Sequence, residues 1–178
     1  MRNFNKGIFA CMGVVLAAMA WVGCSRADSA LTQYNLNNAD IEFVKAASMA
    51  NYTELVLARL DTSMSTDSAM KDFGDMMIAD HTPAGTQLKQ LATEFGMTAV
   101  DTLDDAHVAL RANLMTLSGR SFDSTYIKNM VLDHQAAVTL FQTESTNGQQ
   151  QSIRAFAQSL LPTLQMHLDK ATALASTY

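Results

Sequence analysis

The chain has 178 residues and a formal net charge of −5, and its Lys and Arg residues form no cluster. This composition argues against nucleic-acid binding and against electrostatic docking on anionic lipid, because both need concentrated positive charge. The two cysteines, Cys11 and Cys24, both lie near the N-terminus. The body of the chain therefore has neither a disulfide nor a thiolate metal site.

Residues 1–23 have the pattern of an export signal. Two basic residues near the start precede 17 uncharged, mostly apolar residues that end in small side chains, as in secretory signals. The tripeptide that ends at Cys24 resembles the bacterial lipobox, whose cysteine is lipidated and becomes the first mature residue. The alternative is an uncleaved membrane anchor, which needs roughly 20 apolar residues.

Residues 24–38 are polar and lack a helical period, so we interpret them as a tether between a lipid anchor at Cys24 and a folded domain. Loss of residues 1–23 removes Arg2 and Lys6 and leaves 10 basic against 17 acidic residues. We therefore expect an acidic protein that is attached to a membrane by its lipid. The expected location is the bacterial cell envelope, facing the periplasm, with the outer membrane as the expected site of anchoring.

Residues 39–176 are predicted to form one all-α domain. Four long stretches have apolar residues three and four positions apart, which is typical of amphipathic helices. They are residues 39–63, 67–95, 122–146 and 150–176. Asn38, Thr66 and Ser121 are the expected N-caps of the first three helices.

The lengths of the connections predict the topology. About three residues join the first helix to the second and the third to the fourth, and such short connections make antiparallel neighbours. Residues 97–121 join the second helix to the third and contain a shorter apolar pattern from Leu103 to Leu117. This spacer can run back along a helix of about 37 Å. The sequence therefore predicts a ferritin-like four-helix bundle, up-down-crossover-down-up, with an extra short helix in the crossover.

A short repeat places histidines on two of the predicted helices. Residues 77–81 read Met-Ile-Ala-Asp-His and residues 130–134 read Met-Val-Leu-Asp-His. If these helices run parallel, His81 and His134 lie at similar depth on the apolar side. His167 lies on the inward face of the fourth helix, at a level about 6 Å from that of His134. His107 is expected near the surface, and we assign it no role.

Imidazoles from three helices could hold a transition metal, with Glu54 as the inward acid of the first helix. The estimated level of Glu54 is about 9 Å from that of His81, whereas Asn51 lies closer. Met77 and Met130 stand one turn before two of the histidines. Thioether and imidazole donors together favour copper, Cu(I) especially, and iron is the other candidate.

The ligand pattern of ferritin-like di-iron oxidases is absent. Those sites use a carboxylate three residues before each histidine, and the corresponding residues here are Ile78, Val131 and Leu164. Asp80 and Asp133 directly precede their histidines and point about 100° away around the helix. We expect them to be surface charges or salt-bridge partners.

The sequence favours a structural interpretation of the histidines over metal binding. Buried imidazoles often serve as hydrogen-bonded core residues, and these could bond to one another or to Thr163. Pro83 and Pro162 lie inside helical patterns, and each frees the backbone carbonyl four residues earlier, which a histidine could satisfy.

Five motifs together resemble the bacterial envelope family known as domain of unknown function 4142, often labelled an outer membrane protein. They are Phe43-Val44-x-Ala46-Ala47, Met77-x-x-Asp80-His81, Ser118-Gly119-x-x-Phe122-Asp123, Met130-Val131-x-Asp133-His134-Gln135 and Leu161-Pro162-x-Leu164-x-x-His167-Leu168. The resemblance covers roughly residues 38–175. It implies a ferritin-like bundle in an exported protein and no established reaction. The polar core positions that it implies are Glu54, Asp80, His81, Asp133, His134 and His167.

The sequence therefore predicts a lipid-anchored, non-catalytic helical bundle of the cell envelope that acts through its surface. The alternative is a periplasmic protein that binds copper or iron through His81, His134 and His167, with Glu54 as a further candidate ligand. A redox enzyme that uses this metal is a third option. The sequence shows no phosphate-binding loop and no nucleophile-elbow serine.

Overall fold

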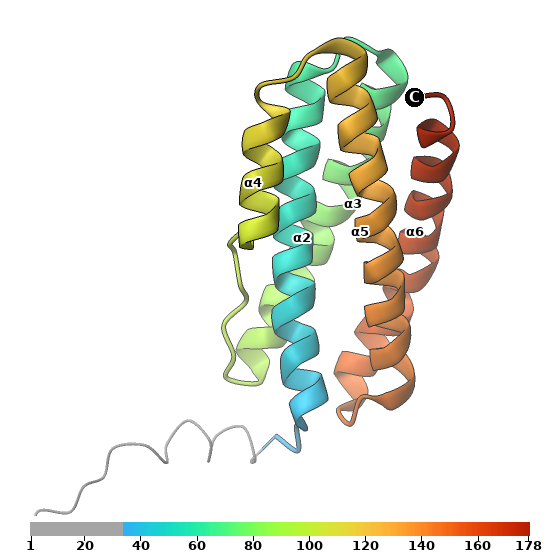
Figure 1. The fold of residues 1–178 in the computed structure, drawn as a ribbon. Helices are drawn as coiled ribbons and strands as arrows, with labels where there is room; N and C mark the ends of the chain where they lie inside the picture. Colours follow the sequence, from blue (N-terminus) through green and yellow to red (C-terminus); the bar gives the residue numbers. More distant parts are fainter. Residues whose placement is uncertain (1–33) are drawn as a thin grey trace, which may run out of the picture.

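The computed structural model describes residues 34–178, so the export signal, Cys24 and most of the predicted tether lie outside the described residues. The helices are α2 (Asn38–Met64), α3 (Ser68–Glu94), α4 (Asp105–Leu114), α5 (Gly119–Asn147) and α6 (Gln151–Ala175) (Figure 1). No strand occurs between residues 34 and 178, and the predicted all-α class is confirmed. None of these helices combines the length and the apolar character that crossing a membrane requires.

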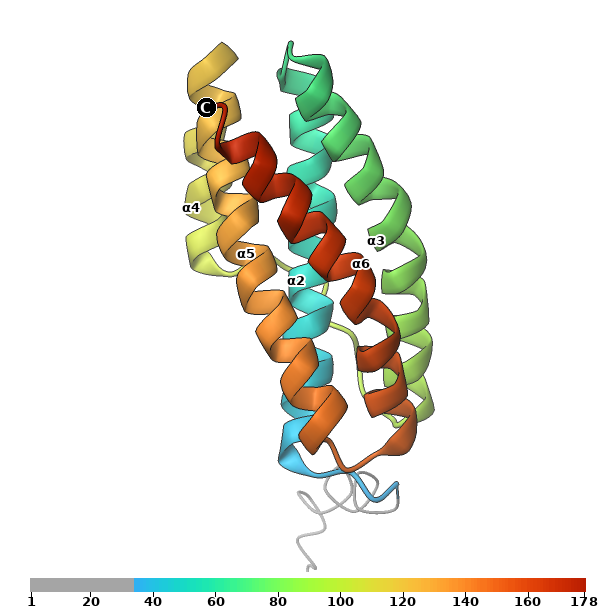
Figure 2. The same ribbon diagram turned by 90° about the vertical axis from the view of Figure 1, so that its right-hand side faces the viewer.

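The four long helices form a bundle whose connections set their directions. Helix α3 packs antiparallel to α2, and α6 packs antiparallel to α5. Between these two hairpins, residues 95–118 return along the outside of α2, and this segment includes α4 (Figure 1). Helices α3 and α5 therefore run in the same direction. The hairpins meet where α2 packs on α5 and α3 packs on α6 (Figure 2).

The helix boundaries differ from the predicted ones by one to three residues, and the predicted N-caps are wrong. Asn37 caps α2 in a reciprocal capping box with Asp40, and Asp67 caps α3. Ser118 precedes α5 at the N-cap position without a side-chain hydrogen bond. Gly96 follows α3 with a φ of +68°, the left-handed conformation that favours glycine at a helix end.

The core is divided into two apolar clusters along the bundle. One cluster gathers Phe43, Val44, Leu88, Phe141 and Ile153 near the α5–α6 turn. The other gathers Leu57, Met70, Phe73, Tyr126 and Ile127 towards the α2–α3 turn. On all four helices the residues between these clusters include buried polar groups, namely Glu54, His81, His134 and His167. The bundle thus encloses a polar layer at mid-height.

Two glycines inside α3 make room for polar side chains of α2. A Cβ atom at Gly85 would collide with the amide of Asn51, and one at Gly74 would lie 2.7 Å from Oδ2 of Asp61. Glycine inside a helix costs about 1 kcal/mol relative to alanine. Close approach of Asn51 and Asp61 to the backbone of α3 accounts for glycine at these two positions.

Asp61 is a buried acid in the cluster that contains Tyr126. The carboxyl group is fully buried, and neither oxygen has a hydrogen-bond partner among the described residues. Burial, followed by the nearby Asp123 carboxylate, raises the pKa of Asp61 from 3.8 to about 8. Asp61 is therefore mainly protonated at neutral pH.

The stability of the protein should depend on pH through Asp61. Between the unfolded pKa of 3.8 and the folded pKa of about 8, the folded state retains a proton that the unfolded chain releases. The contribution of Asp61 to the free energy of unfolding should therefore fall as pH rises through this window. We expect Asp61→Asn to remove this dependence and to exceed the parent in stability at alkaline pH, measured by urea unfolding across the window. The exposed Asp72→Asn is the matched control, and parallel pH profiles for the parent and Asp61→Asn would contradict the assignment.

Candidate metal centre

Three histidines from three helices meet in the polar layer. The ring centroids are 6.1 Å apart for His81 and His134, 5.3 Å for His81 and His167, and 5.4 Å for His134 and His167. One ligand nitrogen from each ring lies within 4.8 Å of the other two. Exposure is 7% for His81 and 0% for His134 and His167. The structure therefore brings together the three histidines that the sequence singled out.

Each imidazole uses one ring nitrogen for a hydrogen bond. Nδ1 of His81 lies 3.2 Å from Oδ1 of Asn51, and Nδ1 of His134 lies 2.9 Å from the carbonyl oxygen of Met130. Nε2 of His167 lies 2.9 Å from Oδ2 of Asp80. Because each partner is an acceptor, these nitrogens carry the hydrogen in the neutral rings.

The other nitrogen of each ring has no hydrogen-bond partner among residues 34–178. These atoms are Nε2 of His81, Nε2 of His134 and Nδ1 of His167, all buried and without a hydrogen bond. In the neutral tautomers each one carries a free lone pair. A buried acceptor without a partner costs about 1–3 kcal/mol. These atoms therefore need a further partner, such as an ion or a water molecule in the adjacent cavity.

Burial keeps the three imidazoles uncharged. Burial, followed by the charges of His167 and His134, lowers the pKa of His81 to about 3. Burial also lowers the pKa of His134 to about 4, against the hydrogen bond to the Met130 carbonyl. The pKa of His167 is lowered by burial as well, although Asp80 opposes the shift. At neutral pH all three rings therefore offer lone pairs and no charge.

A cavity of about 40 Å³ lies beside the histidines, which is enough for one small ion or a water molecule. Its wall includes His81, His167, Glu54 and Asp80, but most of the remaining wall is apolar. The apolar part is formed mainly by Ala47, Ala84, Leu88, Phe141, Phe156 and Leu160. No methionine lines it among the described residues. Met77 and Met130, the predicted thioether donors, are fully buried and belong to the apolar cluster towards the α2–α3 turn. The predicted donors are therefore not part of this cavity wall.

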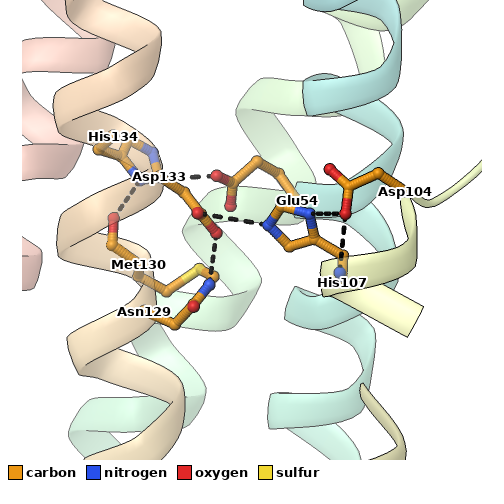
Figure 3. Close-up of polar contacts among 7 residues, drawn as sticks. All are labelled: Glu54, Asp104, His107, Asn129, Met130, Asp133 and His134. Carbon is orange, nitrogen blue, oxygen red and sulfur yellow. Dashed lines mark hydrogen bonds and ion pairs between the residues drawn. The ribbon is translucent and has the colours of Figure 1, made fainter. Parts of the chain in front are cut away.

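Glu54 lies beside the histidines rather than among the three converging nitrogens. Its Oε1 is 3.7 Å from Nδ1 of His134, the nitrogen that faces the Met130 carbonyl, and Oε2 has no partner (Figure 3). Burial, followed by the charge of Asp133, raises the pKa of Glu54 well above its usual range. The neutral carboxyl is thus adjacent to the cluster, and the three histidines form the candidate ligand set without it.

The two aspartates of the repeat have partners that the sequence did not reveal. Asp80 reaches from α3 to His167 on α6, and Asp133 on α5 lies 3.3 Å from Nε2 of His107 on α4. His107 is only partly exposed and also contacts Asp104 at 2.8 Å (Figure 3). From the helical pattern, Asp80 and Asp133 were expected only to be surface charges or salt-bridge partners, and His107 was assigned no role.

The backbone carbonyls freed by the prolines are not the partners of the histidines. Pro83 lies within α3 and Pro162 within α6, and the carbonyls in question belong to Ala79 and Gln158. The hydrogen bonds of the three rings go elsewhere, to Asn51, the Met130 carbonyl and Asp80. This version of the structural interpretation is therefore wrong.

One nitrogen of each ring lies close enough to one nitrogen of the other two for the three rings to share a metal. A metal about 2.0 Å from three nitrogens in its plane needs them about 3.5 Å apart. Since the nitrogens lie within 4.8 Å of one another, inward movement of roughly 1 Å would complete such a site. The partners on the far nitrogens would orient the rings, as the outer-shell groups of metal sites do.

Fold and site together define a four-helix bundle with a buried cluster of neutral histidines at mid-height. The family described as Domain of unknown function (DUF4142) matches residues 25–174, and the chain belongs to this family. This confirms the resemblance seen in the motifs. No curated protein matches the sequence.

Solved structures share the fold at low sequence identity. A crystal structure of a DUF305 fragment from Deinococcus radiodurans has a TM-score of 0.71 at 14% identity and covers 80% of this chain and 99% of its own. CopM in the Cu(II)-bound form has a TM-score of 0.67 at 14% identity, with 78% and 96% coverage. CopM in the Cu(I)-bound form has a TM-score of 0.66 at 15% identity and the same coverage. At these identities the likeness shows a common helical fold and nothing about ligands.

The tautomers of the three rings can be measured directly. We expect ¹⁵N–¹H correlation spectra of the metal-free protein to show His81 and His134 protonated at Nδ1 and His167 at Nε2. His81 and His134, whose pKa values are lowered to about 3 and 4, should remain neutral at about pH 6. His167, whose pKa is lowered by burial, should be charged to a smaller extent than His107, whose pKa is raised by Asp104 and Asp133 against the effect of burial. Titration of any of the three buried rings near the usual histidine pKa would contradict this arrangement.

Proposed function

We propose that this protein binds one Cu(I) ion through His81, His134 and His167. The observation that carries the proposal is that each buried ring has one hydrogen-bonded nitrogen and one nitrogen with no partner. Three unsatisfied acceptors in one polar layer are costly for the fold by itself. A metal that accepts all three lone pairs would offset that cost.

The charge of the site favours a monovalent ion. The three imidazoles are neutral, Glu54 is protonated, and much of the adjacent cavity wall is apolar. An uncompensated charge is expensive in such surroundings, and a double charge more so. Cu(I) therefore suits the site better than Zn(II) or Fe(II), and nitrogen donors suit copper. Iron is the other metal considered from the sequence. Iron sites in ferritin-like proteins use carboxylate ligands, and the set of three histidines contains none.

The names of three solved structures of one protein, CopM, give independent support. CopM was solved with Cu(II), Cu(I) and silver bound, and these structures share the fold at 14–16% identity. Silver(I) has the same charge and soft character as Cu(I), so it serves as a probe of the proposed site. The support concerns the kind of ion and not the residues that bind it.

The wider setting of the protein is also a proposal. The export signal and Cys24 suggest a lipid-anchored protein of the cell envelope that faces the periplasm, with the outer membrane as its place. The run of the helices, with one long crossover, suggests a member of the ferritin-like bundles. We propose that the protein binds its ion without turning over a substrate.

Metal analysis of the purified protein tests the site. We expect one equivalent of Cu(I) or Ag(I) per chain and a melting temperature that rises with ion concentration, since the ion binds only the folded state. His81→Ala, His134→Ala and His167→Ala should each lose stoichiometric binding. Ile127→Val is the control, because it loosens the buried core of α5 away from the histidines and should retain the ion.

A structural role would give a different result. The parent would then bind no ion, and the histidine variants would lose stability alone. That result would support the other interpretation, in which the protein is a non-catalytic helical bundle that binds no metal.

A second prediction concerns the effect of Asp80 on the affinity for Cu(I). Its carboxylate holds Nε2 of His167 from a neighbouring helix and leaves Nδ1 free. Asp80→Ala should weaken Cu(I) binding by about 10- to 100-fold, as is usual when an outer-shell partner of a metal-binding histidine is lost. Asp80→Asn keeps an acceptor and should recover part of the affinity. Equal affinities for the parent and Asp80→Ala, measured by competition with a chelator, would show that Asp80 does not position His167.

A further inference from the structure

A second cavity lies on the other side of Glu54 from the histidine cavity. It is a groove of about 240 Å³ between α2, α4 and α5. The donor groups in its lining come from Met49, Thr53, Glu54, Asp104, His107 and Asp133. The groove therefore presents carboxylate, imidazole and thioether groups, which are donors suited to metal cations.

The wall between the groove and the histidine cavity is thin. Three residues line both spaces, namely Ala50, Glu54 and Ala137. An alanine side chain ends at its Cβ atom, so Glu54 is the only one of the three whose side chain can fill the passage. Figure 3 shows the carboxyl of Glu54 between His134 on one side and the His107 cluster on the other.

Glu54 is held loosely for a buried carboxyl group. Oε1 lies 3.7 Å from Nδ1 of His134, which is too far for a hydrogen bond. Oε2 is buried and has no partner, although 5% of the residue is exposed. No hydrogen bond from a described residue therefore fixes the carboxyl, and its rotation breaks none.

The outer part of the groove carries two carboxyl groups on either side of His107. Asp104 and Asp133 bind the two ring nitrogens of His107 at 2.8 and 3.3 Å, and Asn129 donates to the second oxygen of Asp133 at 2.6 Å (Figure 3). Carboxylates gathered in a concave surface raise the local concentration of positive ions. A cation that arrives here meets oxygen donors first, then Glu54, and then the histidines.

The other walls of the histidine cavity are poorer routes. Leu88, Phe141, Phe156 and Leu160 offer no donor to an ion that has lost its water, and such an ion is costly without donors. Asp80 is the one other carboxylate in the lining, and its Oδ2 is bound to His167. A path beside Asp80 would disturb the hydrogen bond that orients this ring.

We propose that the groove between α2, α4 and α5 is the entrance through which a monovalent copper or silver ion reaches the histidines, with Glu54 as its gate. The proposal rests on the proposed function, since it requires an ion at the three imidazoles. Glu54 rotates to bind the ion in passing and then returns to the wall. The gate therefore changes the rates of uptake and release by the same factor and leaves the affinity unchanged.

Exchange kinetics of Cu(I) test this proposal. Release is followed as colour develops in an excess of a Cu(I)-specific chelator, and affinity is measured separately by competition. Glu54→Leu keeps a side chain of similar size in the wall but removes the oxygen donors. We therefore expect the release and uptake of Cu(I) to slow by roughly tenfold or more, with little change in the affinity for Cu(I). Glu54→Ala opens the passage and should exchange the ion at least as fast as the parent.

A second pair of variants tests the mouth of the groove without altering the gate. Asp104→Asn removes a charge but keeps a side-chain oxygen that can cap α4, so it should slow uptake and weaken its salt dependence. Asp105→Asn makes the same charge change at the next, exposed position of α4 and should match the parent. If Glu54→Leu exchanges Cu(I) as fast as the parent, the entrance is overturned and the metal site stands. If the parent takes up no Cu(I), the proposed function fails and the entrance fails with it.

Discussion

The architecture depends on a polar layer that is enclosed by apolar side chains above and below. Two hydrophobic clusters lie on either side of the histidines, whose own exposure is at most 7%. In this buried layer a polar atom must find a partner or destabilise the fold. Half of the imidazole nitrogens in the layer are satisfied and half are not. The satisfied half fixes the orientation of the rings, and the unsatisfied half would bind the proposed ion. The same burial that lowers the pKa values of the rings keeps their lone pairs free for that ion.

The sequence predicted the long helices well because the helical period was repeated over many turns. It failed at the helix starts, where several good capping residues lie together. Asn37 and Asn38 are adjacent, as are Thr66 and Asp67, and propensity alone does not rank such neighbours. The position within the turn decides which side chain reaches the free backbone N–H groups, and that position depends on how the preceding residues enter the helix.

The candidate site was predictable as a set of residues and not as a set of contacts. The repeat and the expected parallel helices placed His81 and His134 at one level, and the structure agrees. The contact between Asp80 and His167 joins two helices across 87 positions, and it depends on the rotation of each helix about its axis. The spacing of residues along the chain determines the height of a side chain in the bundle but not the rotation of its helix about the helix axis. One contact did have a signal in the sequence. Gly85, in the middle of α3, marks the place where the side chain of Asn51 approaches the helix backbone.

The origin of the three rings has a consequence for assembly. His81 belongs to the α2–α3 hairpin, whereas His134 and His167 belong to the α5–α6 hairpin, and the hairpins pack more extensively within themselves than on each other. An ion bound by all three rings would link the two hairpins, which are otherwise connected in sequence only by the long crossover. Neither half contains the full set of ligands, so the coordination sphere would exist only after the halves have docked. Metal binding would then occur only in the fully folded protein. Loss of the ion would weaken the interface between the hairpins before it weakened the packing within each hairpin.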